Sequence, residues 1–343
     1  MKTIDEKEYK IKLIKGKLIE VEHTIVNKDK INEDLPRVVS LFSGCGGLDL
    51  GFTNAGFNVV WANDINKKLI ETYNYNHPNT EFIIKSISDI PSSEIPDCDV
   101  IIGGPPCQSW SIGGSLRGID DDRGKLFLEY IRIIKDKKPK VFIAENVKGI
   151  ISSRHKQTFD SFIKSFKDIG YNVNYMLLNA KNYGVPQDRE RVIIVGVRED
   201  INRKYEFPEP THKTKYVTLR EAIGDLVNNT DEYMEGSFSS MYMSRNRRRG
   251  WDEVGFTVQA SGRQAQLHPD SPEMIKVDKD KMEFSGEGTV RRMSVRESAR
   301  IQTFPDNFKF ITDRLDEKYK MIGNAVPVKL AEAIAYKVKE ILK

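Results

Sequence analysis

The sequence predicts an α/β protein with a doubly wound, mostly parallel sheet and a second, smaller, irregular domain. Three observations support this. From Arg37 onward, short apolar runs alternate with segments of helical spacing; a glycine-rich loop follows the first run; and near Phe207 this alternation gives way to stretches rich in Arg, Gln, Gly and Ser. Alternation of strands and helices is typical of a parallel sheet covered on both faces. The predicted parts are an N-terminal extension (1–36), a sheet domain (37–206), a smaller domain (207–311) and a C-terminal segment that returns to the sheet domain (312–343).

Apolar runs bounded by turn residues predict seven strands in the sheet domain, at 38–42, 57–63, 81–84, 99–104, 140–146, 172–180 and 191–197. Helical spacing predicts helices from the glycine loop to Gly56, up to Tyr75, and over 124–138, 155–170 and 319–342. Elsewhere the patterns predict a small hairpin around Lys15 and Gly16, a helix capping box at 218–221 and a short strand at 256–260.

Composition excludes several classes of protein. The 343 residues carry three cysteines and a net charge of +4, and no Cys/His spacing is typical of a zinc site. No apolar run approaches the roughly 20 residues of a membrane-spanning helix, and the N-terminus lacks the apolar core of a signal peptide. We therefore expect a cytoplasmic protein that is neither exported nor embedded in a membrane.

Arginines cluster in the second domain. Four of them fall within five positions and a fifth follows: Arg245, Arg247, Arg248, Arg249 and Arg263. A run of charge is ordinarily a solvated face. Arginine next to glutamines such as Gln264 is also what contacts to base edges and phosphates require, so at this point both interpretations stay open.

A rigid turn carries one of the cysteines. In GGPPCQSWS the two prolines have a fixed φ and no N–H, so the chain cannot continue there as a central strand. Because the apolar run 99–104 precedes them, Cys107 is placed at the carboxyl end of a strand, where open α/β sheets bind ligands. A free cysteine is more often a small hydrophobe, and Cys45 and Cys98 keep that interpretation.

The glycine-rich loop FSGCGGLDLG (42–51) follows the first strand and opens a helix. This context suits a nucleotide-bearing cofactor whose charged end lies over the helix N-terminus. The dinucleotide pattern G-x-G-x-x-G would need glycine where Asp49 stands, which weakens an NAD interpretation. Asp64, at the end of the second strand, can hold a ribose diol.

Three further charged residues belong to the same region of the sheet. Glu145 ends the fifth strand, one strand away from Cys107, and Arg189 and Arg191 precede the last strand. Taken alone, the glutamate could cap a loop and the arginines could pair with the acidic residues next to them at the surface.

Taken together, these motifs resemble one family. FSGCGGLDLGF, GGPPCQSWS, ENV, QDRERV, RESARIQTFPDNF and GNAVPVKLAEAIA occur in the order and approximate spacing of the DNA (cytosine-5) methyltransferases. The resemblance runs from about Val38 to the C-terminus. In addition, the block MSRNRRRGWDEVGFTVQASGRQAQLHP, which ends at Pro269, resembles the recognition region of bacterial modification methyltransferases specific for GGCC.

The resemblance implies S-adenosylmethionine as the methyl donor and Cys107 as a nucleophile that adds to carbon-6 of cytosine, which makes carbon-5 electron-rich. It assigns Glu145 to the ring N3 and amino group and Arg189 to O2, with Arg191 in support. The substrate it implies is a flipped-out cytosine in double-stranded DNA. We expect the protein to be a monomer and to belong to a restriction-modification system. The partner in such a system would be a cognate restriction endonuclease that acts on the same site.

The implied binding residues fall into two sets. Expected cofactor contacts are Phe42, Ser43, Gly44, Gly46, Gly47, Leu48, Asp64, Ile65, Ser86, Ile87, Pro105, Asn324 and Val326. Expected DNA contacts are Gln108, Ser111 and Arg123 from a lid at 111–124 and from the turn just before it, Arg245, Arg247 and Arg263 on guanine edges, Arg248 and Arg249 on phosphates, and Gln264.

One position departs from the family pattern. Where the family has an acid in a G-D-I triplet that accepts from the adenine amino group, this chain has Ser86. We expect weaker cofactor binding unless a neighbour such as Asp89 takes over.

Three alternatives remain at the level of sequence. The first is a cytosine-5 methyltransferase acting on transfer RNA, against which the arginine-rich second domain favours duplex DNA. The second is a catalytically inactive DNA-binding module. The third, a thiol redox enzyme, is disfavoured because the chain has no Cys-x-x-Cys pair.

Overall fold

The computed structural model describes residues 9–14, 17–22, 34–106, 122–226 and 231–343. By its internal contacts the chain forms two compact units, Met1–Leu35 and Pro36–Lys343. In the first unit, β1 (Tyr9–Ile14) and β2 (Lys17–Glu22) pair antiparallel, as the alternating pattern predicted.

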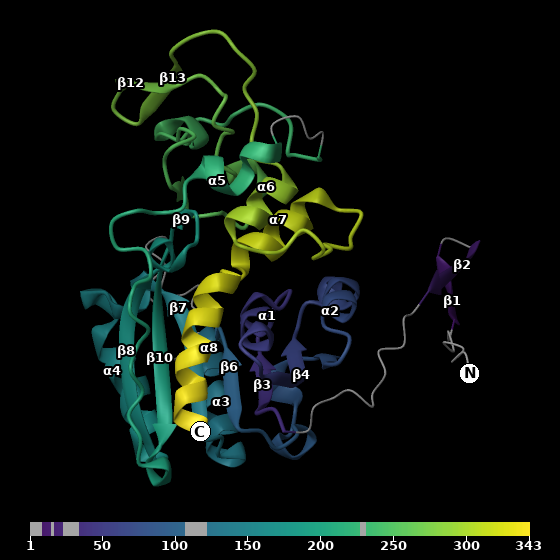
Figure 1. Ribbon diagram of the computed structural model, residues 1–343, viewed down its shortest axis with the longest axis vertical. Coiled ribbons are helices and arrows are strands. Elements are labelled where there is room, and N and C mark those ends of the chain that lie inside the picture. The colour runs from purple at the N-terminus through teal and green to yellow at the C-terminus, as the bar shows by residue number, and fades with distance from the viewer. Residues whose placement is uncertain (1–8, 15–16, 23–33, 107–121, 227–230) are drawn as a thin grey trace, which may run out of the picture. The chain divides into compact units, whose positions relative to one another are not determined.

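The second unit is built on a seven-stranded sheet in the order β5-β4-β3-β6-β7-β10-β8 (Figure 1). Its strands are β3 (Arg37–Leu41), β4 (Asn58–Asp64), β5 (Glu81–Ile84), β6 (Val100–Gly103), β7 (Val141–Val147), β8 (Tyr171–Asn179) and β10 (Glu190–Arg198). The pairs from β5 to β7 are all parallel, which confirms the predicted fold class.

One strand departs from the parallel arrangement that alternating strands and helices predict. β10 lies between β7 and β8 and is antiparallel to both. Only residues 180–189 separate β8 from β10, and they hold one short helical turn and the two-residue strand β9 (Gln187–Asp188). A parallel neighbour would need a crossover of a dozen or more residues, so the chain returns antiparallel instead.

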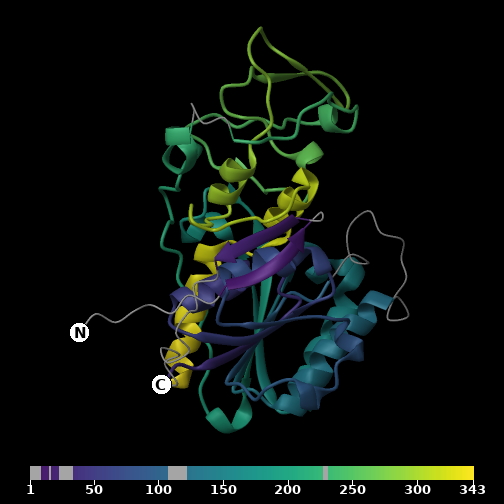
Figure 2. The same ribbon diagram turned by 90° about the vertical axis from the view of Figure 1, so that its right-hand side faces the viewer.

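Helices cover both faces of the sheet (Figure 2). They are α1 (Gly47–Asn54), α2 (Ile70–Asn76), α3 (Asp122–Lys137), α4 (Lys156–Asp168) and α8 (Val328–Leu342). One buried cluster joins α1 and α8 to one face through residues such as Phe52 and Ile334, and another joins α3 and α4 to the opposite face through Phe127 and Phe162. None of the described helices is long and apolar enough to cross a bilayer.

The C-terminal segment forms two helices where the sequence predicted one. α7 (Leu315–Asn324) ends before Pro327, and α8 begins directly after it. Proline has no N–H for a helical hydrogen bond and disfavours helical geometry in the residue before it. Ala325 and Val326, which lie between the two helices, line the pocket described below.

The region after residue 207 is irregular, as predicted. It contains α5 (Leu219–Ile223), α6 (Val295–Ile301), β11 (Gly255–Phe256), β12 (Met274–Asp278) and β13 (Lys281–Phe284). The capping box between Thr218 and Glu221 is confirmed. The boundaries drawn at 207 and 312 remain predictions, since residues 36–343 form one unit by their contacts.

The strand predicted at 256–260 is wrong beyond its first residue. β11 stops at Phe256 because side chains take the partners that a strand ladder would use: Thr257 Oγ1 donates to the Asp188 carbonyl at 2.6 Å, and Val258 N donates to Gln187 Oε1 at 3.1 Å.

Candidate active site

The carboxyl ends of four parallel strands and the α7–α8 junction enclose a pocket of about 550 Å³. The pocket lies at the boundary between β3 and β6. On one side of this boundary the chain adds β4 and β5, and on the other side it adds β7, so the order of the strands reverses here. Open parallel sheets usually bind their ligands at such a point. Every predicted cofactor residue except Gly46 lines it: Phe42, Ser43, Gly44, Gly47, Leu48, Asp64, Ile65, Ser86, Ile87, Pro105, Asn324 and Val326. Glu145, Arg189 and Arg191 line the same pocket.

Gly46 supports the pocket from behind. It has φ 87°, and a Cβ atom built on it would lie 2.0 Å from Nε2 of the buried His77. Only glycine fits there without displacing the imidazole. Gly46 therefore shapes the loop and lies outside the pocket wall, and its predicted contact with the cofactor stays a prediction.

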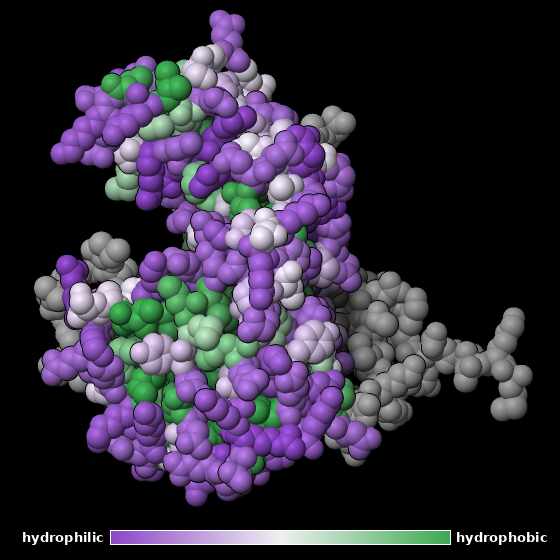
Figure 3. Space-filling model, turned by 60° about the vertical axis from the view of Figure 1, so that its left-hand side comes forward, coloured by the Kyte–Doolittle hydropathy of each residue, from purple (hydrophilic) through white to green (hydrophobic). Residues whose placement is uncertain are grey.

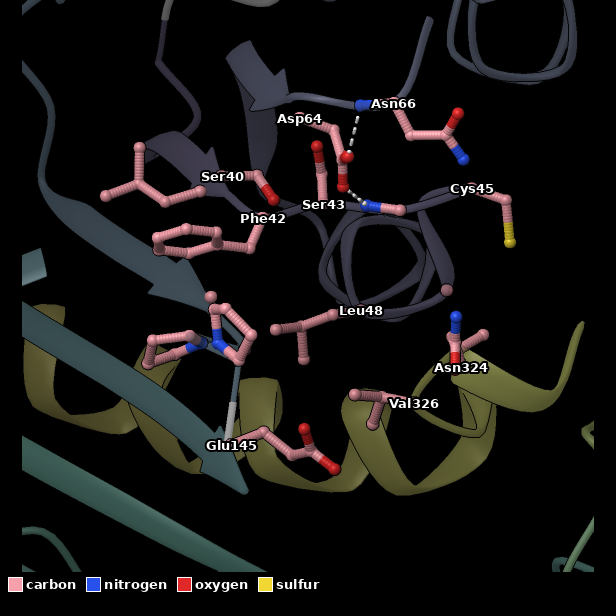
Figure 4. Close-up of a pocket in the computed structure, with 18 of the residues that line it drawn as sticks. Ser40, Phe42, Ser43, Cys45, Leu48, Asp64, Asn66, Glu145, Asn324 and Val326 are labelled. Atoms are coloured by element: carbon pink, nitrogen blue, oxygen red, sulfur yellow. Dashed lines mark hydrogen bonds between the residues drawn. The ribbon is translucent and has the colours of Figure 1, made fainter. Parts of the chain in front are cut away.

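Asp64 connects the glycine loop to the end of β4. Its Oδ2 accepts from Gly44 N and its Oδ1 from Asn66 N, both at 2.9 Å (Figure 4). Burial raises the pKa of this carboxyl, and the two backbone donors oppose the rise. The carboxylate oxygens keep further lone pairs with which a bound diol can interact.

The apolar part of the pocket comes from separate elements. Phe42, Leu48 and Val326 lie around the same space in Figure 4. Ser86 lines the pocket as expected, whereas Asp89 is exposed and does not line it. The compensation suggested for Asp89 is therefore not present in this structure.

A buried amide fixes the turn that precedes Cys107. Asn146 Nδ2 donates to the Pro105 carbonyl at 3.1 Å, joining the end of β7 to the Pro-Pro turn. Cys107, Gln108 and Ser111 lie outside the described residues, as does most of the predicted lid, and nothing is described of the Arg123 side chain in α3. The other two cysteines keep their structural interpretation, since burial raises the pKa of Cys45 and of Cys98 to about 12.

Glu145 and Arg191 form an ion pair in the pocket wall. Arg191 Nε lies 2.8 Å from Glu145 Oε1, and the two side chains are 14% and 13% exposed. The pair brings an acid and a cation from adjacent strands to the edge reached by the Pro-Pro turn.

Arg189 is bound in a different way. Its buried guanidinium donates to the carbonyls of Val258 (3.3 Å), Gly323 (3.0 Å) and Ala325 (3.0 Å). Burial lowers its pKa, and the carbonyl end of α7 provides the compensating negative dipole. With both of its terminal nitrogens bound to main-chain oxygens, Arg189 is placed to hold the α7–α8 junction, and Arg191 is the arginine better placed to meet a substrate.

Sequence reasoning missed two buried glutamines that complete this junction. Gln187 Nε2 donates to Gln302 Oε1 at 2.6 Å, and Gln302 Nε2 donates to the carbonyls of Ile322 (2.7 Å) and Ala325 (3.1 Å). Both lie in recognised motifs, QDRERV and RESARIQTFPDNF, but spacing gives no sign that residues 115 positions apart share a hydrogen bond.

The arginines of the second region divide into two groups. Arg247 is buried and donates to the Tyr242 carbonyl and to Gln264 Oε1, and Arg248 donates to the carbonyls of Ser271 and Pro269. DNA contacts through the same nitrogens, or through Gln264 Oε1, would require these bonds to be exchanged. Arg249 is half-buried over Phe256 and paired with Glu253.

Arg245 and Arg263, by contrast, are exposed. They are the members of the predicted guanine-reading set that this structure leaves open to a partner.

Comparison with known proteins agrees with this geometry. Residues 36–340 match the model of the C-5 cytosine-specific DNA methylases. The chain belongs to this family. Among curated methylases, the Type II methyltransferase M.FnuDI of Fusobacterium nucleatum is 52% identical over 327 residues, covering 89% of this chain and 95% of the relative. M.MthTI of Methanothermobacter thermautotrophicus is 54% identical, covering 89% and 98%.

Solved structures show the same fold. A DNA modification methyltransferase encoded in an E. coli prophage superposes with a TM-score of 0.71 at 23% identity, covering 90% of this chain and 99% of that one. DNMT2 of Spodoptera frugiperda gives 0.64 at 20% identity, covering 90% and 100%. This methylase is thus a cytosine-5 DNA methyltransferase with S-adenosylmethionine as its methyl donor, and these two curated relatives are Type II methyltransferases.

The pocket fits this donor. Main-chain amides at the N-terminus of α1 suit the methionine carboxylate, Asp64 suits the ribose, and Phe42 and Ile87 offer apolar surface to the adenine. Its volume of about 550 Å³ is within the range typical of small-molecule sites.

Proposed function

We propose that this methylase modifies a flipped-out cytosine within GGCC in double-stranded DNA, through a covalent adduct with Cys107. The observation that carries the proposal is the shared pocket: the Glu145–Arg191 pair and the turn leading to Cys107 border the same cavity as the cofactor loop. We further propose that it acts as a cytoplasmic monomer, alongside an endonuclease of the same specificity.

The chemistry needs electron density at carbon-5 of cytosine. The Cys107 thiolate forms a bond to carbon-6, and the electrons of the carbon-5–carbon-6 double bond become available at carbon-5, which takes the methyl group. S-adenosylmethionine supplies that methyl as an electrophile and leaves as the neutral thioether. Loss of the carbon-5 proton and expulsion of the thiolate then restore the aromatic ring and the free enzyme.

The pocket residues stabilise the charge that thiolate addition places on the ring. Glu145 takes up a proton and donates it in a hydrogen bond to N3 while its other oxygen accepts from the amino group, and Arg191 donates to O2. In the free enzyme the Glu145–Arg191 ion pair holds both side chains in position. This exchanges the roles that the resemblance gave to the two arginines, because both terminal nitrogens of Arg189 are bound to carbonyls. Asn146 keeps the Pro-Pro turn in place while the thiol reacts.

DNA recognition is assigned to the second region. The space-filling view shows residues 36–343 hollowed between the sheet and the second region (Figure 3). Flipping a base costs a few kcal/mol, which contacts to the vacated duplex must offset. Arg245 and Arg263 are the first candidates, because an exposed arginine can bind O6 and N7 of guanine bidentately.

The proposal is tested with a Cys107→Ala variant and two DNA substrates. The variant should lose methyl transfer while it retains binding of DNA and S-adenosylhomocysteine, because only the nucleophile has been removed. Substrate DNA containing 5-fluorocytosine should trap the wild-type enzyme covalently through Cys107, as peptide mass spectrometry would show. A linkage through another residue, or no linkage, would contradict the mechanism.

Site specificity has a separate test. DNA treated with the enzyme and S-adenosylmethionine should resist a methylation-sensitive nuclease that cuts GGCC, and should remain open to a nuclease that cuts an unrelated site. Complete cutting at GGCC by the first nuclease would reject this specificity while leaving cytosine-5 methylation intact.

A further inference from the structure

A carboxylate oxygen in the wall of the cofactor pocket lacks a partner. Glu317 lies in the first turn of α7, and its side chain is 6% exposed. Its Oε1 accepts from Lys68 Nζ at 2.6 Å, whereas its Oε2 is buried without a hydrogen-bond partner among the described residues. A buried carboxylate oxygen left unpaired is costly, so a donor from the pocket's occupant is the expected partner.

The fold places Glu317 beside the glycine loop. One turn further along α7, the Met321 carbonyl accepts from Cys45 Sγ at 3.4 Å, which ties this helix to the loop. Side chains four residues apart lie on the same face of a helix, about 5–6 Å from each other. Glu317 is therefore about one helical turn from the loop contact.

The chemistry of the donor selects its amino group as the partner. Amides at the N-terminus of α1 favour the methionine carboxylate, and the ammonium is carried by the carbon next to that carboxylate. The other carboxylate lining this part of the pocket, Asp64, already accepts from two backbone amides. A carboxylate is the strongest acceptor that a side chain can offer an ammonium.

We propose that Glu317 Oε2 binds the α-ammonium of S-adenosylmethionine, with Lys68 holding the other carboxylate oxygen in position. The inference rests on the proposed placement of the methionine end at the glycine loop. It adds a cofactor residue that none of the recognised motifs contains.

The test compares two ligands that differ at the amino-acid end. S-adenosylhomocysteine carries the ammonium, and 5′-methylthioadenosine keeps the nucleoside and thioether but lacks the whole amino-acid end. In the full-length enzyme, Glu317→Gln should weaken S-adenosylhomocysteine binding about 10- to 100-fold by calorimetry and leave 5′-methylthioadenosine binding within about twofold. Glu317→Asp, which keeps the charge on a shorter side chain, should recover part of the loss.

Asp316→Asn is the matched control. Asp316 is the neighbouring acid on the same helix, half-exposed and paired with Arg314, so its loss should change neither affinity. Unchanged binding of 5′-methylthioadenosine also shows that the Glu317→Gln variant is folded.

If Glu317→Gln weakens the binding of both ligands equally, the carboxylate lies at the nucleoside or has a structural role only. If the binding of both ligands is unchanged, the carboxylate meets no donor from the ligand. Either result overturns the inference. Failure of the wild-type enzyme to bind S-adenosylhomocysteine would instead overturn the assignment of the pocket itself.

Discussion

At the scale of single residues, the kind of partner distinguishes two arginines that the sequence places two positions apart. Arg191 pairs with the Glu145 carboxylate and donates to one main-chain carbonyl, that of Glu190, while Arg189 is fully buried and donates to three main-chain carbonyls. A guanidinium whose donors are bound to carbonyls is fixed in place, whereas one paired with a side chain can reorient toward a ligand.

This difference predicts different consequences of mutation. Arg191→Ala should lower kcat for DNA methylation by about 100-fold or more, because removal of one donor to a developing charge costs about 3 kcal/mol. Arg189→Ala should destabilise the fold by about 3 kcal/mol, because the carbonyls of Val258 and Gly323 lose their side-chain donor and that of Ala325 loses one of two. Steady-state kinetics and urea unfolding separate the two. Equal effects of both variants on kcat and on the unfolding midpoint would contradict this division.

Ser86 supports a second prediction at this scale. Ser86→Asp should tighten binding of S-adenosylmethionine about 3- to 30-fold, because a carboxylate makes a stronger hydrogen bond to an amino group than a hydroxyl does. Asp89→Asn is the control and should have no effect, since Asp89 is exposed and outside the pocket. Weaker binding by the aspartate variant would mean that the adenine amino group lies elsewhere.

At the scale of elements, the α7–α8 junction connects the cofactor pocket to the second region. Arg189 and Gln302 bind the carbonyls of the junction, and Gln187 and Arg189 bind both main-chain polar groups of Val258. Asn324 and Val326, which line the pocket, flank the carbonyl that Arg189 and Gln302 share. The positions of Asn324 and Val326 in the pocket wall therefore depend on the hydrogen bonds that Arg189 and Gln302 make behind that wall.

Gln302→Leu tests this connection. The substitution removes the hydrogen bonds of Gln302 to the carbonyls of Ile322 and Ala325 and one of the two acceptors of Gln187 Nε2. It should therefore cost about 2–4 kcal/mol in the free energy of unfolding and weaken S-adenosylhomocysteine binding. Gln157→Leu on the exposed face of α4 is the matched control and should do neither. Stability measured by urea unfolding should be compared with affinity by calorimetry. A loss of stability without any loss of affinity would separate the junction from the pocket.

The same elements show what the sequence could and could not predict. Periodicity located the sheet strands within a few residues, because buried parallel strands are continuous apolar runs. The ordered motifs led to the pocket residues. The position of β10, the short β11 and the roles of the two arginines were not predictable, because each depends on which distant groups meet in space.

At the scale of the whole molecule, one buried cluster joins the sheet domain to the second region. It includes Cys45 from the glycine loop, Leu219 from α5, Ala299 from α6 and Tyr319 from α7. Packing of the second region therefore reaches the back of the cofactor loop. The stability of this assembly also depends on ionisable groups buried beneath that loop.

Two of these groups titrate in opposite directions. Asp49 accepts from Ser40 Oγ (2.5 Å) and Tyr73 OH (2.6 Å), and burial raises its pKa from 3.8 to about 6. His77 lies against the same tyrosine, with ring centroids 4.5 Å apart, and burial lowers its pKa from 6.5 to about 4. Between pH 4 and 6 the folded state thus retains a proton on Asp49 that the unfolded chain releases, and lacks a proton on His77 that the unfolded chain binds.

The two groups should therefore offset each other, and single substitutions should reveal them. As pH rises from about 4 to about 6, Asp49 removes about 1.4 kcal/mol of stability per pH unit and His77 adds about the same. Relative to wild type, Asp49→Asn should gain stability as pH rises through this range, and His77→Gln should lose it. Urea unfolding at half-unit pH steps measures the difference in the free energy of unfolding between each variant and wild type. The difference should level off above about pH 6 for Asp49→Asn and above about pH 6.5 for His77→Gln, because each group then has the same charge in the folded and unfolded states. Parallel pH profiles for all three proteins would show that neither group is held in the protonation state that its burial requires.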